Sequence, residues 1–495
     1  MKTQTENKAE QEPYDTITEE NIQLQGPEET KEYIANYFEN LYQARPSKPE
    51  YLEQTTKIEQ KVKEIEKEMT NKPPIENFSN KELNLAIKKL KRKKASGPDQ
   101  IPNEIFIEAN PGTRQIYLES MNTINKEMSI PPLWQEGELI RLYKGKGLKG
   151  KCSNERGITL SSNYGKLYER LINERALEQV NISEAQAGGR RGTATVDHIL
   201  LAKELIATAK RNKKEAYLTF LDVTKAYDKA WLTGIMYVMH KEGLQDNHWT
   251  IIKRLNENLK ARVQTKHGIT RPISIKDSIR QGGVLSTTMY GILMDEISKE
   301  IKKENIGLEL QDNSDKRGCL LWVDDVFLIT TEGPKLQKAL DITNDTSNKY
   351  HIEYGEPKSN ALKVKHTRKK QIEETFHLGE TQLKNANKYK YLGYIQNTKN
   401  NNDDHYKQIK GKTEAAYQKM MALTGNSSFM QIEMETIWTV MEACIVPIII
   451  YGGEAWEMTT KNYKIPNMIM DNILKRILKT PKEHQGKPCT LRQGY

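Results

Sequence analysis

The sequence lacks the features on which membrane, secreted and zinc-dependent proteins depend. Its longest apolar stretch, residues 443–451, contains Pro447, whereas a membrane-spanning helix needs ~20 apolar residues. The first residues hold no apolar run of the kind found in a signal peptide. Cysteine is scarce, at four residues without a Cys-x-x-Cys pair, which excludes a disulfide framework and argues against a structural zinc site. These absences predict a protein that works in a reducing compartment and has no membrane partner.

Positive charge is what the sequence has in excess. Lysine and arginine number 76 against 66 aspartates and glutamates, which gives a net charge of +10. The first 70 residues are rich in glutamate, so the local positive excess is larger in the rest of the chain. A basic chain favours a polyanionic partner, with nucleic acid as the first candidate. The alternative is a solvated, lysine-rich surface.

The chain divides into three parts by its pattern. Residues 1–79 begin with few apolar residues, up to residue 27 where we expect disorder, and continue with apolar residues at helical spacing. Residues 80–400 alternate helical stretches with short β-prone runs, at residues 139–143, 216–221, 320–323 and 326–330. Residues 401–495 are again helical in pattern. This order predicts an α+β fold with a helical N-terminal extension.

A helix start is marked at Ser79. This residue can cap a helix, and Glu82 follows at the spacing of a capping box. Leu83, Ile87 and Leu90 then form one apolar stripe. Basic residues continue beyond the stripe as Lys91, Arg92, Lys93 and Lys94. This run predicts contacts with the phosphates of a nucleic acid, and the alternative is a nuclear-localisation signal.

Asp222 ends the β-prone run that precedes it. A carboxylate at the end of a strand is a good ligand for a hard metal ion. The alternative is a capping aspartate on a helix that begins directly after the strand, and the pattern alone favours that structural role.

Asp324 and Asp325 lie between two further β-prone runs. Two aspartates at a hairpin tip are ordinary turn residues. They are also the arrangement that holds two Mg²⁺ ions ~3.5–4 Å apart for phosphoryl transfer. Neighbouring carboxylates repel each other and are stable in the ionised form mainly when cations lie between them. Each aspartate motif is a weak signal alone, and the two motifs in one basic chain predict a two-metal site.

Several segments in order give the sequence a resemblance to a known family. Residues 222–228 are similar to the motif F-x-D-x-x-K-A-F/Y-D, residues 280–286 to R-Q-G-x-x-L-S, and residues 322–325 to F/Y-A-D-D. Residues 389–393 are similar to Y-L-G, and residues 94–104 to A-x-G-P-D-x-I-P-x-E. Residues 143–160, 186–197 and 451–456 extend the likeness. The chain resembles the reverse transcriptases of non-LTR (LINE-type) retrotransposons from about residue 80 to residue 460.

The resemblance implies a right-hand polymerase fold. Residues 80–400 would form the fingers and a palm built on an antiparallel sheet, and residues 401–495 a helical thumb and C-terminal segment. Asp222, Asp324 and Asp325 would be catalytic. Together with the backbone carbonyl of Val223 they would hold two Mg²⁺ ions, with Mn²⁺ as an alternative.

The resemblance also implies a site for the incoming nucleotide. Arg156 and a lysine of the Tyr-Lys-Gly-Lys-Gly run would hold the triphosphate. For that lysine, Lys144 is preferred over Lys146. Tyr227 would crowd a ribose 2′-hydroxyl and so select deoxynucleotides, and the alternative is a core aromatic residue on a helix.

Three further residues complete this expected site. Gln281 and Gly282 would form a loop against the nucleotide and the template base, where glycine lets the backbone come close. Lys358 resembles a palm lysine that protonates pyrophosphate. A surface lysine is the equal alternative.

Contacts with primer and template are expected from two more segments. These residues are Trp322, Val323, Tyr391, Leu392 and Gly393, together with the basic run of residues 91–94. Trp322 stands where the family has Phe or Tyr, and Val323 where it commonly has Ala.

The expected activity is RNA-directed DNA synthesis in retrotransposition, in the nucleus of a eukaryotic host and in the cytoplasm otherwise. The expected partners are a template RNA, a primer or nicked target DNA and dNTPs. No endonuclease segment is recognisable, so we expect a fragment, with nicking supplied by a missing part of the element. The alternatives are a nucleic-acid-binding remnant without catalysis and a group II intron maturase-like protein.

Overall fold

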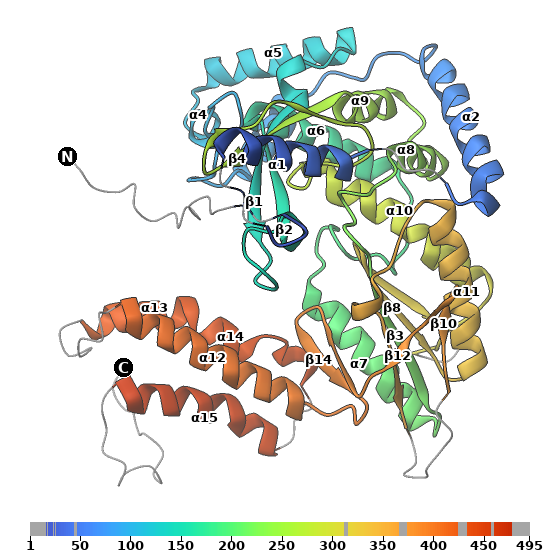
Figure 1. Ribbon diagram of the computed structural model, residues 1–495, viewed down its shortest axis with the longest axis vertical. Helices are drawn as coiled ribbons and strands as arrows, with labels where there is room; N and C mark the ends of the chain where they lie inside the picture. Colours follow the sequence, from blue (N-terminus) through green and yellow to red (C-terminus); the bar gives the residue numbers. More distant parts are fainter. Residues whose placement is uncertain are drawn as a thin grey trace.

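The computed structural model describes nine stretches of the chain, namely residues 16, 18–22, 24, 26–43, 47–310, 315–365, 374–423, 433–456 and 460–477. Within the described residues, strands lie between Glu136 and Asn397 and are mixed with helices, while helices alone precede and follow them, as the sequence predicts. Two sheets dominate, and a group of helices at the C-terminal side packs as a separate layer (Figure 1).

The first sheet lies in the upper lobe of Figure 1 and has the strand order β2-β1-β4-β5, with β6 paired to β4. Its strands are β1 (Glu136–Tyr143), β2 (Glu155–Ser161), β4 (Leu259–Thr265), β5 (Gly268–Ile269) and β6 (Ile273–Ile275). Helices of the same lobe are α3 (Asn80–Lys88), α4 (Asn103–Ile107), α5 (Pro111–Glu127), α6 (Asn163–Gln179), α8 (Leu232–Lys241) and α9 (Asn247–Asn256). The predicted capping box is present at the start of α3, where Ser79 and Glu82 each satisfy a backbone amide of the other.

The N-terminal helices α1 (Pro27–Leu41) and α2 (Leu52–Met69) pack onto this lobe. On α1, Ile34 and Phe38 are buried in one core with strands β4 and β6. Residues before α1 are also held. Thr16 accepts a hydrogen bond from Arg141 at 3.3 Å, and a carboxylate oxygen of Glu19 accepts one from the hydroxyl of Ser153 at 2.9 Å. The expected disorder before residue 27 is therefore wrong for these two residues, because their polar groups are tied to β1 and to the loop before β2.

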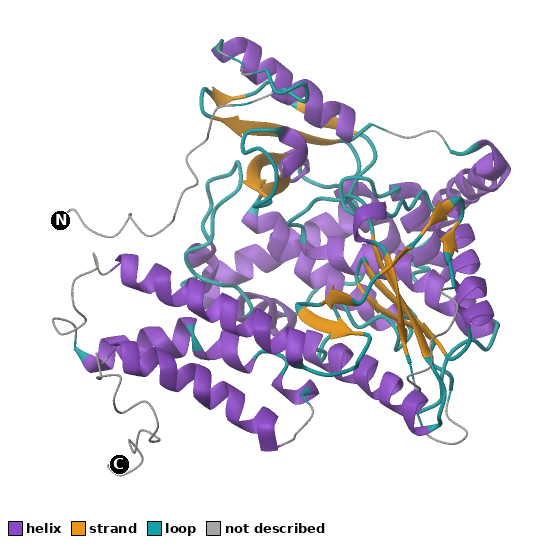
Figure 2. Ribbon diagram, turned by 60° about the horizontal axis from the view of Figure 1, so that its bottom comes forward, coloured by secondary structure: helices purple, strands orange, loops and turns teal. Residues whose placement is uncertain are grey.

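The central sheet is five-stranded, with the order β12-β9-β3-β8-β7. Its strands are β3 (Ala216–Asp222), β7 (Cys319–Trp322), β8 (Asp325–Thr330), β9 (Asn360–Val364) and β12 (Lys384–Asn385). Figure 2 shows these strands flanked by helices, which are α7 (Thr195–Arg211), α10 (Val284–Lys303) and α11 (Gly333–Lys349). Alternate residues of β3 face opposite sides, so Phe220 lies in the core with α7 and Leu221 in the larger core with α10 and α11.

The expected helix directly after Asp222 is wrong. Residues 224–229 form turns, and α8 begins only at Leu232. The backbone N–H of Thr224 donates to the carbonyl of Glu353 at 2.8 Å, and Lys225 has φ of 51°. The left-handed residue prevents a helix from starting here, and the bond from Thr224 to Glu353 fixes the turn in its place.

Two small hairpins and four helices follow the central sheet. The hairpins pair β10 (His377–Leu378) with β11 (Thr381–Gln382), and β13 (Lys388–Tyr391) with β14 (Tyr394–Asn397). The helices are α12 (Asp403–Leu423), α13 (Met434–Cys444), α14 (Val446–Ile450) and α15 (Thr460–Ile477). They share a core of their own that includes Tyr417, Met441 and Ile473. Gly425, a residue type that often ends a helix, follows α12 in the sequence and lies outside the described residues.

One segment of the described chain, Glu435–Ala455, has the length and mean hydropathy, 1.5, that would let a helix cross a membrane. In this fold the segment is divided into α13, α14 and a 3₁₀ turn. Ile437, Ile445 and Ile449 are buried in the core of the C-terminal helices.

Candidate active site

Three aspartates meet at one end of the central sheet. Strand β3 ends at Asp222, and the antiparallel register places Asp222 directly opposite Asp325, the first residue of β8. Trp322 pairs with Asp325, so Val323 and Asp324 form the two-residue turn between β7 and β8. The sheet thus carries three carboxylates on adjacent positions, two from a hairpin and one from the central strand.

Lys358 neutralises one of these carboxylates. Its Nζ lies 2.8 Å from Oδ2 of Asp222, and it belongs to the short 3₁₀ turn Glu356–Lys358 that precedes β9. The backbone fixes this turn, since the N–H of Gly355 donates to the carbonyl of Asp222 at 2.9 Å. The sequence left Lys358 open between a functional and a surface role, and the fold brings it to the aspartates.

Burial and mutual repulsion keep the other two carboxylates from ionising easily. Burial raises the pKa of Asp325 to about 7, with a further rise from the charges of Asp324 and Asp222. The pKa of Asp324 is raised by burial, and the charge of Asp222 adds to the rise. The cations of Arg156 and Lys358 act in the opposite direction on Asp324. The local charge therefore calls for further cations.

The donor set suits a hard divalent cation, because carboxylate and carbonyl oxygens are the ligands that Mg²⁺ prefers. Within the described residues no three His, Cys, Asp or Glu side chains are arranged as a ready metal site. One reason is visible in the ion pair, since Oδ2 of Asp222 is engaged by Lys358. The carboxylate oxygens of the three aspartates thus have the chemistry that Mg²⁺ requires. Cation binding here requires the carboxylates to converge and this ion pair to open.

Tyr227 and Val223 lie on the turn that follows Asp222. Val223 is buried and forms an isolated bridge with Tyr354. The ring of Tyr227 packs against the ring of Tyr290, with centroids 5.7 Å apart. Burial raises the pKa of Tyr227, and the charge of Asp324 adds to this rise. Tyr227 therefore stands close to the carboxylates on a turn, not on a helix.

The first sheet contributes cations to the same region. Arg156 is an exposed residue of β2, and its charge acts on Asp324. Lys144 donates from Nζ to the carbonyl of Ser153 at 2.9 Å. Burial lowers the pKa of Lys144, and the charges of Lys225 and Arg156 lower it further. Lys146 is exposed in the same loop.

The loop at Gln281 docks onto β2. The carbonyl of Gln281 accepts a hydrogen bond from the backbone N–H of Thr159 at 2.9 Å. Gly282 has φ of 119°, and a Cβ on this residue would lie 2.9 Å from the carbonyl oxygen of Thr159. Glycine is therefore required by backbone conformation and by close approach together.

Sequence reasoning assigned no role to two buried charges that hold this loop. Arg280, adjacent to Gln281, donates to Oε1 of Glu169 at 2.8 Å and to the carbonyl of Trp134 at 2.7 Å. The second oxygen of Glu169 accepts from the backbone N–H of Val284 at 2.8 Å. The Arg-Gln-Gly motif contained the signal for Arg280, but its partner Glu169 is 111 residues away.

The residues expected at primer and template fall in different settings. Trp322 packs edge-on against His198, with ring centroids 5.6 Å apart. Tyr391 is buried in the core beside Phe220 and Phe327. Leu392 and Gly393 form the turn between β13 and β14, with φ of 45° and 87°. This turn meets the C-terminal helices, because the hydroxyl of Tyr451 donates to the carbonyl of Leu392.

The basic run of residues 91–94 lies apart from the aspartates. All four side chains are exposed in the loop after α3. Arg92 forms an ion pair with Glu108, at the end of α4. Figure 1 places α4 in the upper lobe, away from the central sheet.

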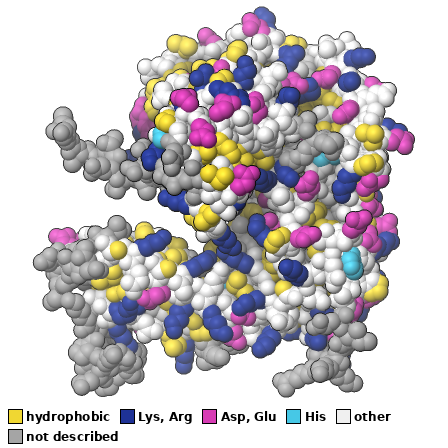
Figure 3. Space-filling model, in the orientation of Figure 1, with side chains coloured by type: hydrophobic (Ala, Val, Ile, Leu, Met, Phe, Trp, Pro, Cys, Tyr) yellow, Lys and Arg dark blue, Asp and Glu magenta, His cyan; other side chains and the backbone are white. Residues whose placement is uncertain are grey.

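A broad notch opens between the upper lobe and the C-terminal helices. Figure 3 shows lysine and arginine side chains gathered along the inner side of this notch. Positive charge on a concave surface attracts a polyanion.

Comparisons with known proteins agree on one family. Residues 144–396 match the family described as reverse transcriptase (RNA-dependent DNA polymerase). The chain is 22% identical over 473 residues to the probable RNA-directed DNA polymerase from transposon BS of Drosophila melanogaster. The aligned region covers 92% of this chain and 50% of that protein. The chain is 24% identical over 405 residues to the probable RNA-directed DNA polymerase from transposon X-element of the same organism, covering 79% and 42%. The RNA-directed DNA polymerase from mobile element jockey is 21% identical to this chain over 399 residues, which cover 79% of this chain and 42% of that protein. The chain spans half or less of the length of these relatives.

We predict that Asp325→Asn stabilises the metal-free protein at pH 8. Because the pKa of Asp325 is raised to about 7, the folded state binds more protons than the unfolded state between about pH 4 and this value. The free energy of unfolding of the parent therefore falls as the pH rises through that window. The variant avoids this loss, so we expect a gain of up to about 4 kcal/mol at pH 8 and little difference at pH 4.

Urea unfolding in the presence of EDTA measures both values. Asp341→Asn, on the exposed surface of α11, is the matched control and is expected to change neither. A gain of the same size at pH 4 and pH 8 would contradict the assignment of the raised pKa to Asp325.

Proposed function

Because the chain belongs to the reverse transcriptase (RNA-dependent DNA polymerase) family, we propose that it extends a DNA 3′ end on an RNA template. The observation that carries this proposal is the meeting of Asp222, Asp324 and Asp325 at one end of the central sheet, beside a notch lined by basic side chains (Figure 3). Paired carboxylates next to a polyanion-binding surface suit nucleotidyl transfer.

The proposed right-hand architecture follows from the same arrangement. The first sheet and its helices would be the fingers, the central sheet with α7, α10 and α11 the palm, and α12 to α15 the thumb. A primer–template duplex would occupy the notch between fingers and thumb. The core that α12 to α15 keep for themselves supports a thumb that packs as its own unit.

The metal requirement is part of the proposal. Two Mg²⁺ ions held by the three aspartates and the carbonyl of Val223 would supply the positive charge that this site lacks, with Mn²⁺ as a substitute. Lys358 neutralises Asp222 in the absence of a metal and carries a proton on Nζ. That proton is available to a departing pyrophosphate. Arg156 and Lys144 would bind the triphosphate from the side of the fingers.

The biological setting is proposed from the relatives. Their names place them in transposons and mobile elements, and we propose that this chain acts in non-LTR retrotransposition. Its partners would be the element's RNA, a nicked target DNA and dNTPs. An endonuclease activity carried by another part of the element would make the nick, and synthesis at chromosomal DNA would take place in the nucleus.

Primer extension on an RNA template with dNTPs and Mg²⁺ tests the proposal directly. We expect the parent to extend the primer and Asp324→Asn to lose roughly a thousandfold or more in rate, because it removes one of the buried carboxylates. Asp341→Asn should extend like the parent. Failure of the parent with tight binding of an RNA–DNA duplex retained would favour a nucleic-acid-binding protein without catalysis.

The two lysines of the fingers loop are distinguished by a second prediction. Lys144 experiences the charges of Arg156 and Lys358, so Lys144→Gln should raise the KM for dNTP by about tenfold. Lys146→Gln, a matched change two residues away, should raise it by less than about twofold. Steady-state extension at varied dNTP concentration gives both values. A larger effect at Lys146 would reverse the assignment.

Tyr227 provides a third prediction, about the choice of sugar. Tyr227→Ala removes a ring that is held against Tyr290, which opens space for a 2′-hydroxyl. Incorporation of ribonucleotides relative to deoxynucleotides should rise by roughly tenfold or more. Single-nucleotide incorporation with rNTP and dNTP measures the ratio, and Tyr227→Phe is expected to keep the parent's ratio. An unchanged ratio in Tyr227→Ala would exclude Tyr227 as the gate.

A further inference from the structure

Residues 185–187 run beside strand β7 and are joined to it by two backbone hydrogen bonds. The backbone N–H of Leu321 donates to the carbonyl of Ala185 at 2.8 Å, and the N–H of Ala187 donates to the carbonyl of Leu321 at 3.1 Å. Gln186 and Leu321 form a parallel bridge. The segment therefore runs along the catalytic hairpin and delivers Gln186 to its turn.

The side chain of Gln186 uses its full hydrogen-bonding capacity against this turn. Its Oε1 accepts from the backbone N–H groups of Val323 at 2.9 Å and Gly188 at 3.0 Å. Its Nε2 donates to the carbonyls of Val323 and Gly291, both at 3.3 Å. Gln186 is 1% exposed, so water does not compete for these bonds. A single amide group holds both the N–H and the C=O of Val323.

The backbone conformation of Val323 is strained and needs these hydrogen bonds to stabilise it. Val323 has φ of 56°, in the left-handed region, and a β-branched residue there is strained by about 1–2 kcal/mol. Strained backbone persists only where its surroundings fix it from several sides. Val323 directly precedes Asp324, so the conformation of Val323 sets the direction in which the Asp324 carboxylate leaves the turn.

The contact between segment and turn is as close as a backbone permits. A Cβ on Gly188 would lie 2.3 Å from the backbone nitrogen of Val323. Any other residue at position 188 would push the turn away. The glycine that allows the approach and the glutamine that fixes it are two residues apart.

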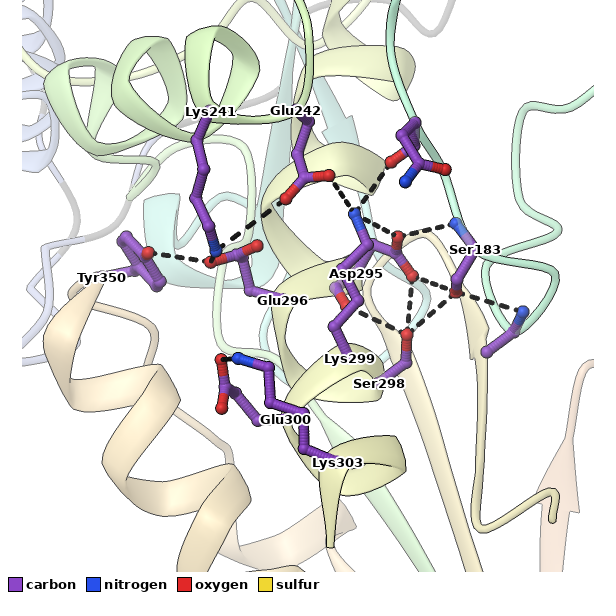
Figure 4. Close-up of polar contacts among 12 residues, drawn as sticks. Ser183, Lys241, Glu242, Asp295, Glu296, Ser298, Lys299, Glu300, Lys303 and Tyr350 are labelled. Carbon is purple, nitrogen blue, oxygen red and sulfur yellow. Dashed lines mark hydrogen bonds and ion pairs between the residues drawn. The ribbon is translucent and has the colours of Figure 1, made fainter. Parts of the chain in front are cut away.

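The segment is anchored at its other end to α10. The backbone N–H of Ser183 donates to Asp295 at 2.8 Å, and its hydroxyl lies 2.9 Å from that of Ser298. Figure 4 shows Ser183 enclosed by these two side chains, with Lys299 bridging Asp295 and Glu242. Asp295 is fully buried. The segment thus forms a strut from the body of the palm to the catalytic turn, and Gln186 is its terminal contact.

We propose that Gln186 is a positioning residue for catalysis, which holds the Val323–Asp324 turn in the conformation that presents the Asp324 carboxylate. This inference rests on the proposed function. Removing the amide should release the turn, so that Asp324 no longer points in one direction. The rate of the chemical step should then fall with little change in nucleotide binding, because no contact of Gln186 reaches the residues expected to hold the triphosphate.

Gln186→Met is the main test, since methionine keeps the length and volume of the side chain and removes all four hydrogen bonds. We expect kcat for primer extension to fall about 10- to 100-fold, with the KM for dNTP changed by less than about threefold. Asn125→Leu removes a comparable buried amide, fully enclosed and bonded to Tyr168 and Glu76, at a distance from the turn. That control should lose stability but keep the parent's kcat.

A double variant separates positioning from general stability. Glycine adopts positive φ without strain, so Val323→Gly should depend less on the strut. We compare kcat of Gln186→Met, of Val323→Gly and of the double variant. The double variant should have a kcat at least about threefold higher than that of Gln186→Met alone. A loss of kcat that Val323→Gly does not relieve would overturn the proposal, as would a folded Gln186→Met variant with the parent's kcat.

Hydrogen exchange gives a readout that does not require activity. In the parent the Val323 amide is protected by its bond to Gln186, and this protection should fall in Gln186→Met while that of β8 remains. Unchanged protection would overturn the inference. If Gln186→Met does not fold, Gln186→Asn, with a shorter amide, is measured in the same way and against the same outcomes. An inactive parent with protection lost in the variant would count against the proposed function while supporting the strut.

Discussion

The repulsion among three half-buried carboxylates is the constraint on which this structure depends. Antiparallel register between β3 and β8 places Asp222 opposite Asp325, and the hairpin turn adds Asp324. Burial and shared charge raise the pKa of Asp325 to about 7, so the site is unfavourable as an isolated cluster of anions. Neighbouring elements must therefore supply positive charge to this end of the sheet. That charge must come from side chains whose place a substrate or a cation can take.

The compensation comes from elements distant in sequence. Lys358 arrives on the turn before β9 and pairs with Asp222, while Arg156 acts on Asp324 from the first sheet. Both side chains are exposed to solvent, so each can leave its aspartate and bind another anion. The backbone around them is fixed by buried polar groups instead. The ion pair of Arg280 with Glu169 and the network of Ser183 with Asp295 hold the loops in place without entering the site.

Local patterns in the sequence predicted local structure well. The strands at residues 139–143 and 216–221 and the capping box at Ser79 are all present, because apolar β-prone runs and side-chain capping are short-range signals. The two aspartate motifs in one basic chain predicted a shared metal site, whereas the place of Lys358 followed only from resemblance, since it lies 136 residues from Asp222. The turn after Asp222 was predicted as a helix because nothing local reveals that Glu353 uses the amide of Thr224. Gln186 was visible only as part of a motif, since its partner is a strained peptide at Val323.

The contact between Tyr451 and the β13–β14 turn has a mechanical consequence. Tyr451 precedes the short 3₁₀ turn after α14, its hydroxyl bonds to Leu392, and its carbonyl meets His405 at the start of α12 at 3.1 Å. Gly393 is in the left-handed region, with the ring of Tyr451 directly against it. The C-terminal helices are thus joined to the central sheet at the tip of a hairpin, and to α7 through a small core that holds Ile199, Tyr394 and Ala455. A force applied to these helices would therefore reach the sheet through the hairpin tip and through α7, and not by direct contact with the turn that carries Asp324.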